Sequence, residues 1–177
     1  MIVATRLVVL LCCLALAACG ERAPEDEAAA TATATPTAAA GAGGSTALGS
    51  IATDLSKKPA IPKPTGTPPA QLQTKDIVTG KGPAAKAGDN VQMQYVGVAW
   101  SDGKQFDASW DRGQPFTFQL GSGNVIQGWD RGIVGMRQGG RRLLVIPPSL
   151  GYGAAGAGGT IKPNETLVFV VDLEKIQ

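Results

Sequence analysis

The most informative absence in this 177-residue chain is histidine, which does not occur at all. Without an imidazole the chain cannot form a Ser-His-Asp or Cys-His catalytic group, a His-ligated zinc site or an imidazole general base. An excess of one charge is also lacking, because 16 basic and 14 acidic residues leave a net charge of +2. This balance argues against nucleic acid as a partner, since phosphate backbones are bound by strongly basic surfaces.

Aromatic residues make up only 5% of the chain, and their positions are more informative than their number. The nine rings (Trp 3, Tyr 2, Phe 4) all lie between Tyr95 and Phe169. The large side chains that could fill a hydrophobic core are therefore confined to the C-terminal half.

Cysteine is scarce as well, and all three cysteines lie at positions 12, 13 and 19. Arg6 precedes an apolar run over residues 7–18, which is shorter than the ~20 residues of a membrane-spanning helix but has the length of a signal-peptide core. The run ends in Leu-Ala-Ala-Cys-Gly, which resembles a bacterial lipoprotein cleavage site. We therefore predict a lipoprotein signal peptide over residues 1–18 and lipid attachment at Cys19, with an ordinary signal peptide as the alternative.

This signal peptide has consequences for location and chemistry. Gly20, rather than an aspartate, follows Cys19, and by the sorting rule for lipoproteins this predicts the outer membrane, with the domain facing the periplasm. The mature chain keeps no pair of cysteines, so it has no intramolecular disulfide, no thiol nucleophile and no cysteine metal site. We accordingly expect neither a metal nor a cofactor.

Residues 19–70 have the composition of a disordered linker. From residue 20 to residue 70 there is no aromatic residue, and alanine, threonine, glycine and proline dominate. Such a segment cannot bury enough apolar area to offset the loss of conformational entropy on folding. We predict a flexible tether that holds a folded domain, residues 71–177, away from a membrane; a linker with no role beyond separation is the alternative.

Hydrophobic periodicity after residue 70 predicts an α+β domain. Short segments at residues 91–96, 116–120, 143–146 and 167–173 are apolar or alternate apolar and polar residues, as strands do. One segment has helical spacing instead, with Asn124 as the expected N-cap and with apolar positions at Val125, Ile126, Trp129 and Ile133. We predict an antiparallel β-sheet wrapped around one short α-helix.

An ordered series of short motifs runs through almost the whole of residues 71–177. The series comprises Tyr95-Val96-Gly97, Phe106-Asp107-Ala108-Ser109, Pro115-Phe116, Val125-Ile126-Gln127-Gly128-Trp129, Gly140-Arg141-Arg142, Tyr152-Gly153 and Thr166-Leu167-Val168-Phe169. Any one of these motifs is weak, but the series in this order and at these spacings is very specific. The sequence resembles the FKBP-type peptidyl-prolyl cis-trans isomerases, in a bacterial lipoprotein form, and this resemblance implies an FKBP-like sheet around its helix.

The resemblance implies a pocket for a proline ring, lined by hydrophobic side chains. Trp129 would be its floor, at the start of the helix. Phe106 and Ile161 would face the residue that precedes the proline. The remaining lining would come from Tyr95, Phe116, Phe169 and Val125.

The resemblance also implies groups that act on the rotating bond. The backbone N–H of Ile126 and the hydroxyl of Tyr152 would donate hydrogen bonds to substrate carbonyls. Asp107 would lie beside the rotating carbonyl, where its dipole or charge can act on the twisted amide; it need not be a general base. Arg112 would pair with Asp107, and Tyr95 would hydrogen-bond the same carboxylate, which would keep it ionised and in place.

This reaction suits a domain without histidine or cysteine. Rotation about an X–Pro bond faces a barrier of about 18–20 kcal/mol because resonance stabilises the planar amide. No covalent bond breaks, so neither a nucleophile nor a metal is required. A site need only favour the twisted amide, by excluding water from its carbonyl and by holding the proline ring.

Several residues have a plainer alternative. Aromatic residues are, one by one, more often core residues than ligand contacts, and Phe118 is assigned partly to the core. Asp107 and Arg112 could form a surface ion pair of little energetic value. Arg141 and Arg142 are expected at a solvated strand end.

We therefore predict a membrane-anchored peptidyl-prolyl isomerase that acts on exported polypeptides and assists their folding at the cell envelope. The resemblance implies rapamycin-class macrolides as inhibitors, and a monomer is expected. Two alternatives remain open: a non-catalytic module that binds a proline-containing loop, and a chaperone anchored to the membrane.

Overall fold

A computed structural model of the protein describes residues 48–177. The predicted signal peptide, the predicted lipid attachment at Cys19 and the first part of the predicted linker lie outside the described residues. Within the described part, no helix is long and apolar enough to cross a membrane.

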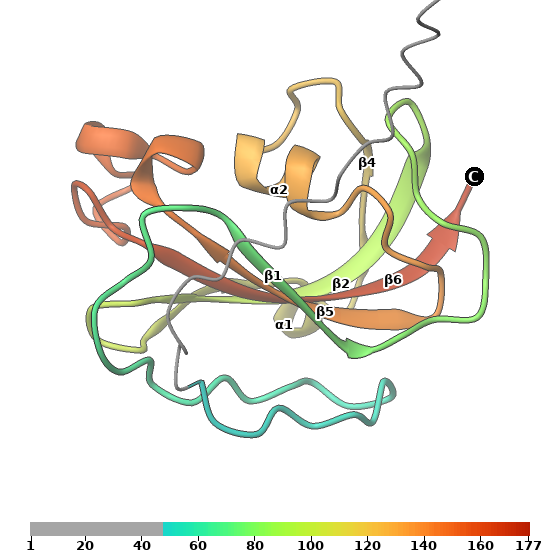
Figure 1. The fold of residues 1–177 in the computed structure, drawn as a ribbon, viewed down its shortest axis with the longest axis horizontal. Helices are drawn as coiled ribbons and strands as arrows, with labels where there is room; N and C mark the ends of the chain where they lie inside the picture. Colours follow the sequence, from blue (N-terminus) through green and yellow to red (C-terminus); the bar gives the residue numbers. More distant parts are fainter. Residues whose placement is uncertain (1–47) are drawn as a thin grey trace, which may run out of the picture. The chain divides into compact units, whose positions relative to one another are not determined.

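Six antiparallel strands form one sheet (Figure 1). Along the sheet the order is β1-β5-β6-β2-β3, and β4 also pairs with β2. The long strands β2 and β6 are neighbours at its centre, with Val96 opposite Val170. The strands are β1 (Gln73–Val78), β2 (Asn90–Ala99), β3 (Gln105–Ala108), β4 (Phe116–Gln119), β5 (Gly140–Ile146) and β6 (Leu167–Ile176). The prediction of an antiparallel sheet around one short α-helix is confirmed in its fold class, an antiparallel sheet with few helices.

The predicted helix is α2 (Gln127–Gly132), which lies against one face of the sheet (Figure 1). Its N-cap is Ile126, without a side-chain cap, so the prediction of Asn124 as N-cap is wrong. The turn before the helix is held differently: the carboxylate of Asp130 accepts hydrogen bonds from the backbone N–H groups of Gly121 and Gly123, at 2.8 and 3.1 Å. A side chain within the helix thus reaches back to the turn, and Asn124 is not needed for it.

Three shorter helical turns complete the fold. They are α1 (Ser109–Arg112), η1 (Pro148–Leu150) and η2 (Gly153–Ala155). The first follows β3 without a break, and the other two lie in the connection between β5 and β6.

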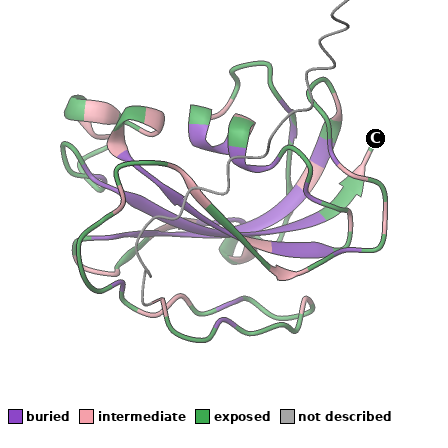
Figure 2. Cartoon of the chain, viewed as in Figure 1, coloured by how far each residue is buried: buried purple, intermediate pink, exposed green. Residues whose placement is uncertain are grey.

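Both faces of the sheet are covered, and the buried positions follow its strands (Figure 2). On β6, Phe169 and Val171 belong to the cluster beneath α2, whereas Val168 and Val170 belong to a second cluster on the other face. Alternate residues of a strand point to opposite faces, so a strand that is apolar at every position is buried on both.

The second face is covered by residues 48–64, which we call the strap (blue-green in Figure 1). Ile51 is buried in the second cluster, and Leu48 and Ile61 pack against it, as does Trp110 of α1. The prediction of a disordered linker up to residue 70 therefore differs from the structure at residues 48–64, which pack on the second face of the sheet. The strap is poor in apolar residues, but the few it has meet an apolar sheet face that local composition does not reveal.

A buried ion pair ties the strap to the sheet. Arg141 is fully buried; its Nε and Nη2 lie 2.5 and 2.6 Å from the two carboxylate oxygens of Asp172. The same guanidinium donates to the backbone carbonyls of Ala52 and Lys57, at 2.6 and 3.1 Å. Burial raises the pKa of Asp172, although the hydrogen bond and charge of Arg141 oppose this.

The prediction of a solvated strand end for the two arginines is therefore wrong. Arg141 is enclosed because the strap lies over it, and its donors meet the strap's carbonyls. Arg142 points to the other face, where its guanidinium binds Asp76 of β1 and the carbonyls of Gly132 and Val134 at the end of α2. Both side chains join segments that are distant in the sequence.

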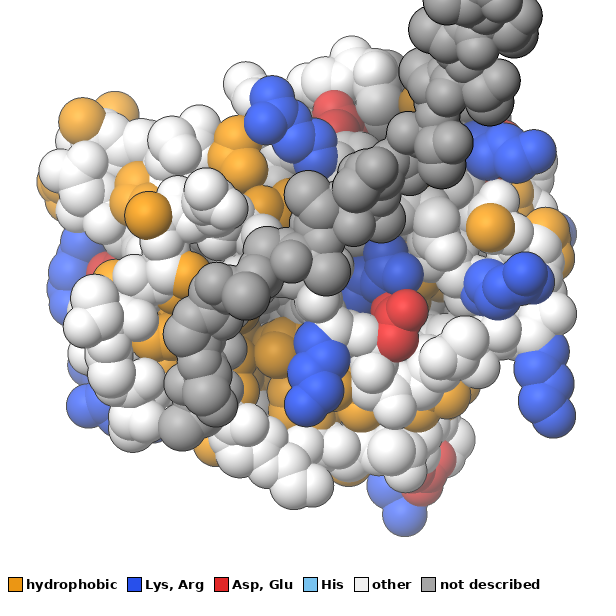
Figure 3. All heavy atoms as spheres, in the orientation of Figure 1, with side chains coloured by type: hydrophobic (Ala, Val, Ile, Leu, Met, Phe, Trp, Pro, Cys, Tyr) orange, Lys and Arg blue, Asp and Glu red, His pale blue; other side chains and the backbone are white. Residues whose placement is uncertain are grey.

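Lys and Arg side chains are dispersed over the face of the molecule drawn in Figure 3. Hydrophobic and uncharged polar atoms separate them there. This arrangement differs from the continuous basic surface that binds phosphate backbones.

The buried ion pair gives a test of the strap. Replacing Arg141 by Met leaves the buried carboxylate of Asp172 unpaired and two strap carbonyls without a donor, so we expect the free energy of unfolding to fall by about 3–5 kcal/mol. The matched control is Arg131→Met, on the exposed side of α2, which should change it by less than about 0.5 kcal/mol. Urea unfolding followed by tryptophan fluorescence measures both, and equal stability of the two variants would contradict the role of Arg141.

Candidate active site around Trp129

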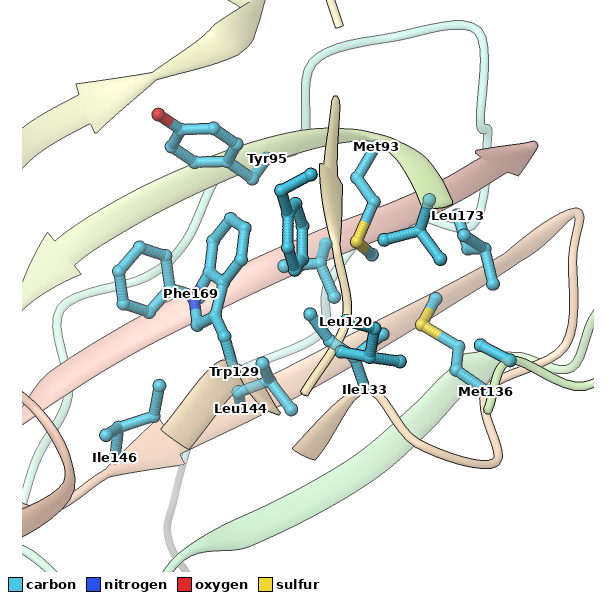
Figure 4. Packing of buried hydrophobic residues seen from close by; sticks show 14 of the residues in the cluster. Met93, Tyr95, Leu120, Trp129, Ile133, Met136, Leu144, Ile146, Phe169 and Leu173 are labelled. Carbon is cyan, nitrogen blue, oxygen red and sulfur yellow. The ribbon is translucent and has the colours of Figure 1, made fainter. Parts of the chain in front are cut away.

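Trp129 is the centre of a cluster of aromatic rings. It is the third residue of α2, only 4% exposed, and points from the helix toward the sheet (Figure 4). Its ring centroid lies 5.0 Å from that of Tyr95 on β2 and 5.3 Å from that of Phe169 on β6, both in edge-to-face geometry. Aromatic rings attract one another in this arrangement beyond their burial of area.

The strand β4 adds two more rings to the cluster. Phe116 and Phe118 stack on each other with centroids 5.3 Å apart, and both lie near Trp129, at 6.2 and 5.7 Å. Phe118 is buried, whereas Phe116 is 37% exposed. The assignment of Phe118 to the core is confirmed, and the exposure of Phe116 opens the cluster to solvent.

Close packing between β2 and the rings depends on Gly97. A Cβ atom at this position would lie 2.7 Å from atoms of both Phe106 and Phe169, which is closer than real Cβ contacts come. Those two rings meet edge to face, with centroids 5.4 Å apart. Only glycine at position 97 therefore allows Phe106 of β3 to lie beside the cluster.

Asp107 is held in place by two side chains. The Tyr95 hydroxyl donates to one carboxylate oxygen, and Arg112 Nη1 lies 2.5 Å from the other. Arg112 Nη2 also donates to the Tyr95 hydroxyl oxygen at 2.7 Å, and its guanidinium lies 5.5 Å from the Tyr95 ring centroid. The predicted contacts among Asp107, Arg112 and Tyr95 are present, in a closed triangle at the edge of the aromatic cluster.

Burial and hydrogen bonding keep Tyr95 protonated. Loss of solvation, followed by the hydrogen bond to Asp107, raises the pKa of Tyr95 to about 12, although Arg112 opposes this. The hydrogen bonds to Tyr95 and then to Asp107 raise the pKa of Arg112. At neutral pH the site therefore contains a neutral phenol donor and a cationic guanidinium on the same carboxylate.

The other predicted site residues lie in or against the same cluster, with one exception. Ile161 is buried in it, and Val125 and Ile126 pack against it just before α2. Tyr152 lies at the start of η2 and is 41% exposed. Its place beside the site still rests on the resemblance alone.

One polar residue that positions Tyr95, Ser109, did not emerge as functional from the sequence. The Ser109 hydroxyl accepts a hydrogen bond from the backbone N–H of Tyr95 at 2.8 Å and donates one to Gln94 at 2.5 Å. Ser109 is fully buried, and it follows Asp107 by two residues. Its presence in the motif Phe106-Asp107-Ala108-Ser109 was the only available signal.

A separate hollow of about 410 Å³ has a different character. It is lined by Val78, Thr79, Lys81, Gly82, Gln138, Gly139 and Glu174. None of these residues is aromatic, so the hollow offers no flat apolar wall for a proline ring.

Comparison with known proteins decides the family. The family model of the FKBP-type peptidyl-prolyl cis-trans isomerases matches residues 82–174, which include the aromatic cluster and the Asp107 triangle. The chain belongs to this family. Its FKBP domain therefore belongs to an enzyme class that isomerises peptidyl-prolyl bonds.

Individual relatives agree with this assignment. An FK506-binding protein of Streptomyces anulatus is 58% identical over 118 residues, which cover 66% of this chain and 95% of the relative. Among solved structures, AtFKBP13 has a TM-score of 0.56 at 41% identity, covering 60% of this chain and 93% of that one. FkpA from Escherichia coli has a TM-score of 0.55 at 44% identity, covering 60% of this chain and 48% of that one.

The raised pKa of Tyr95 predicts that the folded domain loses stability at strongly alkaline pH as Tyr95 ionises. The folded FKBP domain holds this proton up to a pKa of about 12, whereas an unfolded tyrosine titrates near 10. The stability that this difference contributes is complete below about pH 10 and is lost as the pH rises through about 12. Ultraviolet absorbance of tyrosinate should therefore show a step near pH 12 in the folded domain.

Two variants show which tyrosine gives this step in absorbance. Tyr95→Phe should abolish it, and Tyr152→Phe should leave it in place, because the chain has only these two tyrosines. A step near pH 12 that survives in Tyr95→Phe would show that the triangle does not hold the proton.

Proposed function

We propose that this FKBP-type protein accelerates rotation of X–Pro bonds in exported polypeptides, at the envelope of a bacterial cell. The observation that carries the proposal is the aromatic cluster around Trp129 beside a carboxylate held on both of its oxygens. Part of the cluster is open to solvent through Phe116, so an apolar ring can reach it.

The aromatic cluster supports the proposal because it can hold a proline ring by shape. Edge-to-face contacts fix Tyr95 and Phe169 around Trp129, and these rings cannot rearrange without losing their packing. A proline ring packed on Trp129 would be held, while the preceding carbonyl would stay free to turn. Transfer from water into the cluster costs the twisted amide less free energy than it costs the planar, more dipolar amide. This difference favours the transition state.

The state of Asp107 supports an electrostatic role for this residue. Its two oxygens accept hydrogen bonds from Tyr95 and Arg112, so the carboxylate is poorly placed to take a proton from a substrate. A fixed carboxylate can instead orient the twisted amide through its charge. Because the donors are already in position, little reorganisation is needed during the reaction.

The relatives that are named FK506-binding proteins support a second ligand class. We extend this property to the present chain: a macrolide of the FK506 and rapamycin class would occupy the same aromatic cluster and compete with proline-containing polypeptides. The domain would act as a monomer, with no cofactor.

The proposed location rests on the first 20 residues. The apolar run of residues 7–18, the small residues before Cys19 and the glycine after it support a lipid anchor in the outer membrane, with the FKBP domain on the periplasmic side. The strap would then connect the anchored segment to the domain.

The proposed activity is tested with a protease-coupled assay on an X–Pro peptide. We expect acceleration by the purified protein, inhibited by rapamycin. Asp107→Asn and Trp129→Leu should each lower kcat/KM by about tenfold, which corresponds to ~1.4 kcal/mol of transition-state stabilisation. Asp107→Asn keeps the shape of the side chain but removes its charge, and Trp129→Leu removes the flat apolar floor.

The matched control is Asp111→Asn, which changes an exposed carboxylate on α1 that binds Lys58 and Gln105 instead. This variant should keep kcat/KM within about twofold, since its carboxylate lies outside the triangle. Rapamycin binding without any acceleration would reject the enzyme and favour a binding module. Unchanged rates in both Asp107→Asn and Trp129→Leu would show that the site lies elsewhere.

Lipid attachment is tested by metabolic labelling with palmitate in a bacterium that processes lipoproteins. The wild-type protein and the control Cys13→Ser should carry the label, because only the thiol at the cleavage site is acylated. Cys19→Ser should carry none. Persistent label in Cys19→Ser would refute attachment at this residue.

A further inference from the structure

The strands that carry the triangle also carry residues of the second cluster, on the opposite face of the sheet. Tyr95 belongs to the aromatic cluster, whereas the next residue, Val96, is buried in the second cluster. On β3, Ala108 follows Asp107; it pairs with Val96 and is buried in the second cluster as well. Because alternate residues of a strand point to opposite faces, packing in the second cluster supports the triangle from behind.

The remaining member of the triangle, Arg112, lies on a helix that cannot hold its own shape. Helix α1 has only four residues, and its N-cap, Ala108, provides no side-chain hydrogen bond. The N–H of Gly113 closes the last turn by donating to the carbonyl of Trp110 at 3.2 Å. A single helical turn is unstable in isolation, because it fixes several backbone dihedrals for one hydrogen bond. The position of Arg112 therefore depends on the side chains that attach α1 to the rest of the domain.

Two side chains of α1 make this attachment. Ser109 is fully buried, and its hydroxyl binds the N–H of Tyr95 and the side chain of Gln94. Trp110 packs against the second cluster. Its indole Nε1 is buried, and none of residues 48–177 offers it a hydrogen bond. Apolar packing, rather than hydrogen bonding, therefore holds the indole.

The strap contributes to the cluster against which Trp110 packs. Ile51 of the strap is 6% exposed and buried in the second cluster, and Ile61 packs against the same cluster. The strap also reaches α1 directly, because Lys58 Nζ lies 2.5 Å from a carboxylate oxygen of Asp111. Both side chains of this ion pair are well exposed, so it adds little stability, and the apolar contacts are the stronger ones.

The strap lies outside the part of the chain that the family model matches, residues 82–174. Its position is fixed on the second face, because its carbonyls at Ala52 and Lys57 accept hydrogen bonds from the buried Arg141. A role of the strap in the site is therefore not implied by membership of the family. It has to be argued from the contacts of this chain.

We propose that Trp110 is a positioning residue: the strap holds it against the second cluster, and this fixes α1 so that Arg112 stays on the carboxylate of Asp107. The inference rests on the proposed function, because it assumes that this carboxylate acts on the rotating X–Pro bond. Trp110 acts through Arg112 in this role and touches no substrate atom. Release of the strap would let α1 move, and Asp107 would lose one of the two donors that hold it.

The experiment is a double-mutant cycle on the full-length protein, measured with the protease-coupled assay. Trp110→Ala removes the packed indole and should lower kcat/KM by about fivefold, mainly through kcat, because a displaced carboxylate no longer orients the twisted amide. Arg112→Met should lower kcat/KM at least as much. The double variant should stay within about twofold of Arg112→Met alone, since a residue that acts only through another adds no separate loss.

Two further variants connect the effect to the strap and to the ring. Ile51→Ala loosens the strap without altering α1, so it should lower kcat/KM in the same direction as Trp110→Ala and to a smaller extent. Trp110→Phe keeps a flat ring and gives up no hydrogen bond. It should therefore keep kcat/KM within about twofold of the wild type.

Val145→Ala is the matched control for general destabilisation. Val145 is 1% exposed in the same second cluster, but it lies on β5, and β6 and β2 separate that strand from β3. Val145→Ala should lower the stability of the domain while keeping kcat/KM within about twofold. Additive losses in the double variant, or a loss in Val145→Ala or Trp110→Phe as large as in Trp110→Ala, would overturn the proposal. So would an unchanged kcat/KM in both Trp110→Ala and Ile51→Ala.

Ionisation of Tyr95 reports on the triangle without any substrate. In a Tyr152→Phe background, Trp110→Ala should move the tyrosinate step from about pH 12 toward the ordinary value near 10, because the burial of Tyr95 and its hydrogen bond to Asp107 both depend on a closed triangle. Val145→Ala should leave the step in place. If the wild type accelerates no X–Pro bond, the proposed function fails, while the positioning role is still judged on this step. If the wild type is active and neither the step nor the cycle responds to Trp110, only the present proposal fails.

Discussion

The close approach of α2 to the sheet is the constraint on which the candidate site depends. A methyl group at Gly128 would overlap with the side chain of Ile146 on β5, so only glycine allows the helix to lie this low. As a result, the next residue, Trp129, lies among rings from β2, β4 and β6 (Figure 4). A helix held a few ångströms higher would separate these rings and leave no continuous aromatic surface.

The other face of the sheet supports this arrangement from behind. Because β6 is buried on both sides, its position is fixed by the cluster around Trp129 and by the strap together. Two of the ion pairs differ in burial and in role. Arg141 and Asp172 are buried and hold the fold, whereas Arg112 and Asp107 are half exposed and lie where a substrate can reach them.

Much of the fold and of the candidate site could be predicted from local patterns. Hydrophobic patterns located the strands β2, β4, β5 and β6 but not β1 or β3, and the spacing of Trp129 and Ile133 located the helix α2. The triangle of Tyr95, Asp107 and Arg112 followed from the family resemblance, and the structure contains its three contacts. These predictions succeed because hydrophobic periodicity and short motifs depend on residues that are close together in the sequence.

The errors share one physical cause. Arg141 looks like a solvated residue, and residues 48–64 look like linker, because each lacks its partner nearby in the sequence. Glu165 and Ser101 are 64 residues apart, so no local pattern shows that the glutamate is buried. Asn124 has the chemistry of an N-cap, but the helix begins two residues later, with Ile126 at the N-cap position. For Arg141, the strap and Glu165, a contact between distant residues outweighs a local preference.

The sequence by itself thus determined the fold class, the family and the aromatic composition of the site, because these are written in periodicity and in the order of short motifs. Only the tertiary structure decided that part of the predicted linker packs on the sheet and which charges are buried. Those features depend on desolvation and on hydrogen bonds between segments that meet only when the chain is folded.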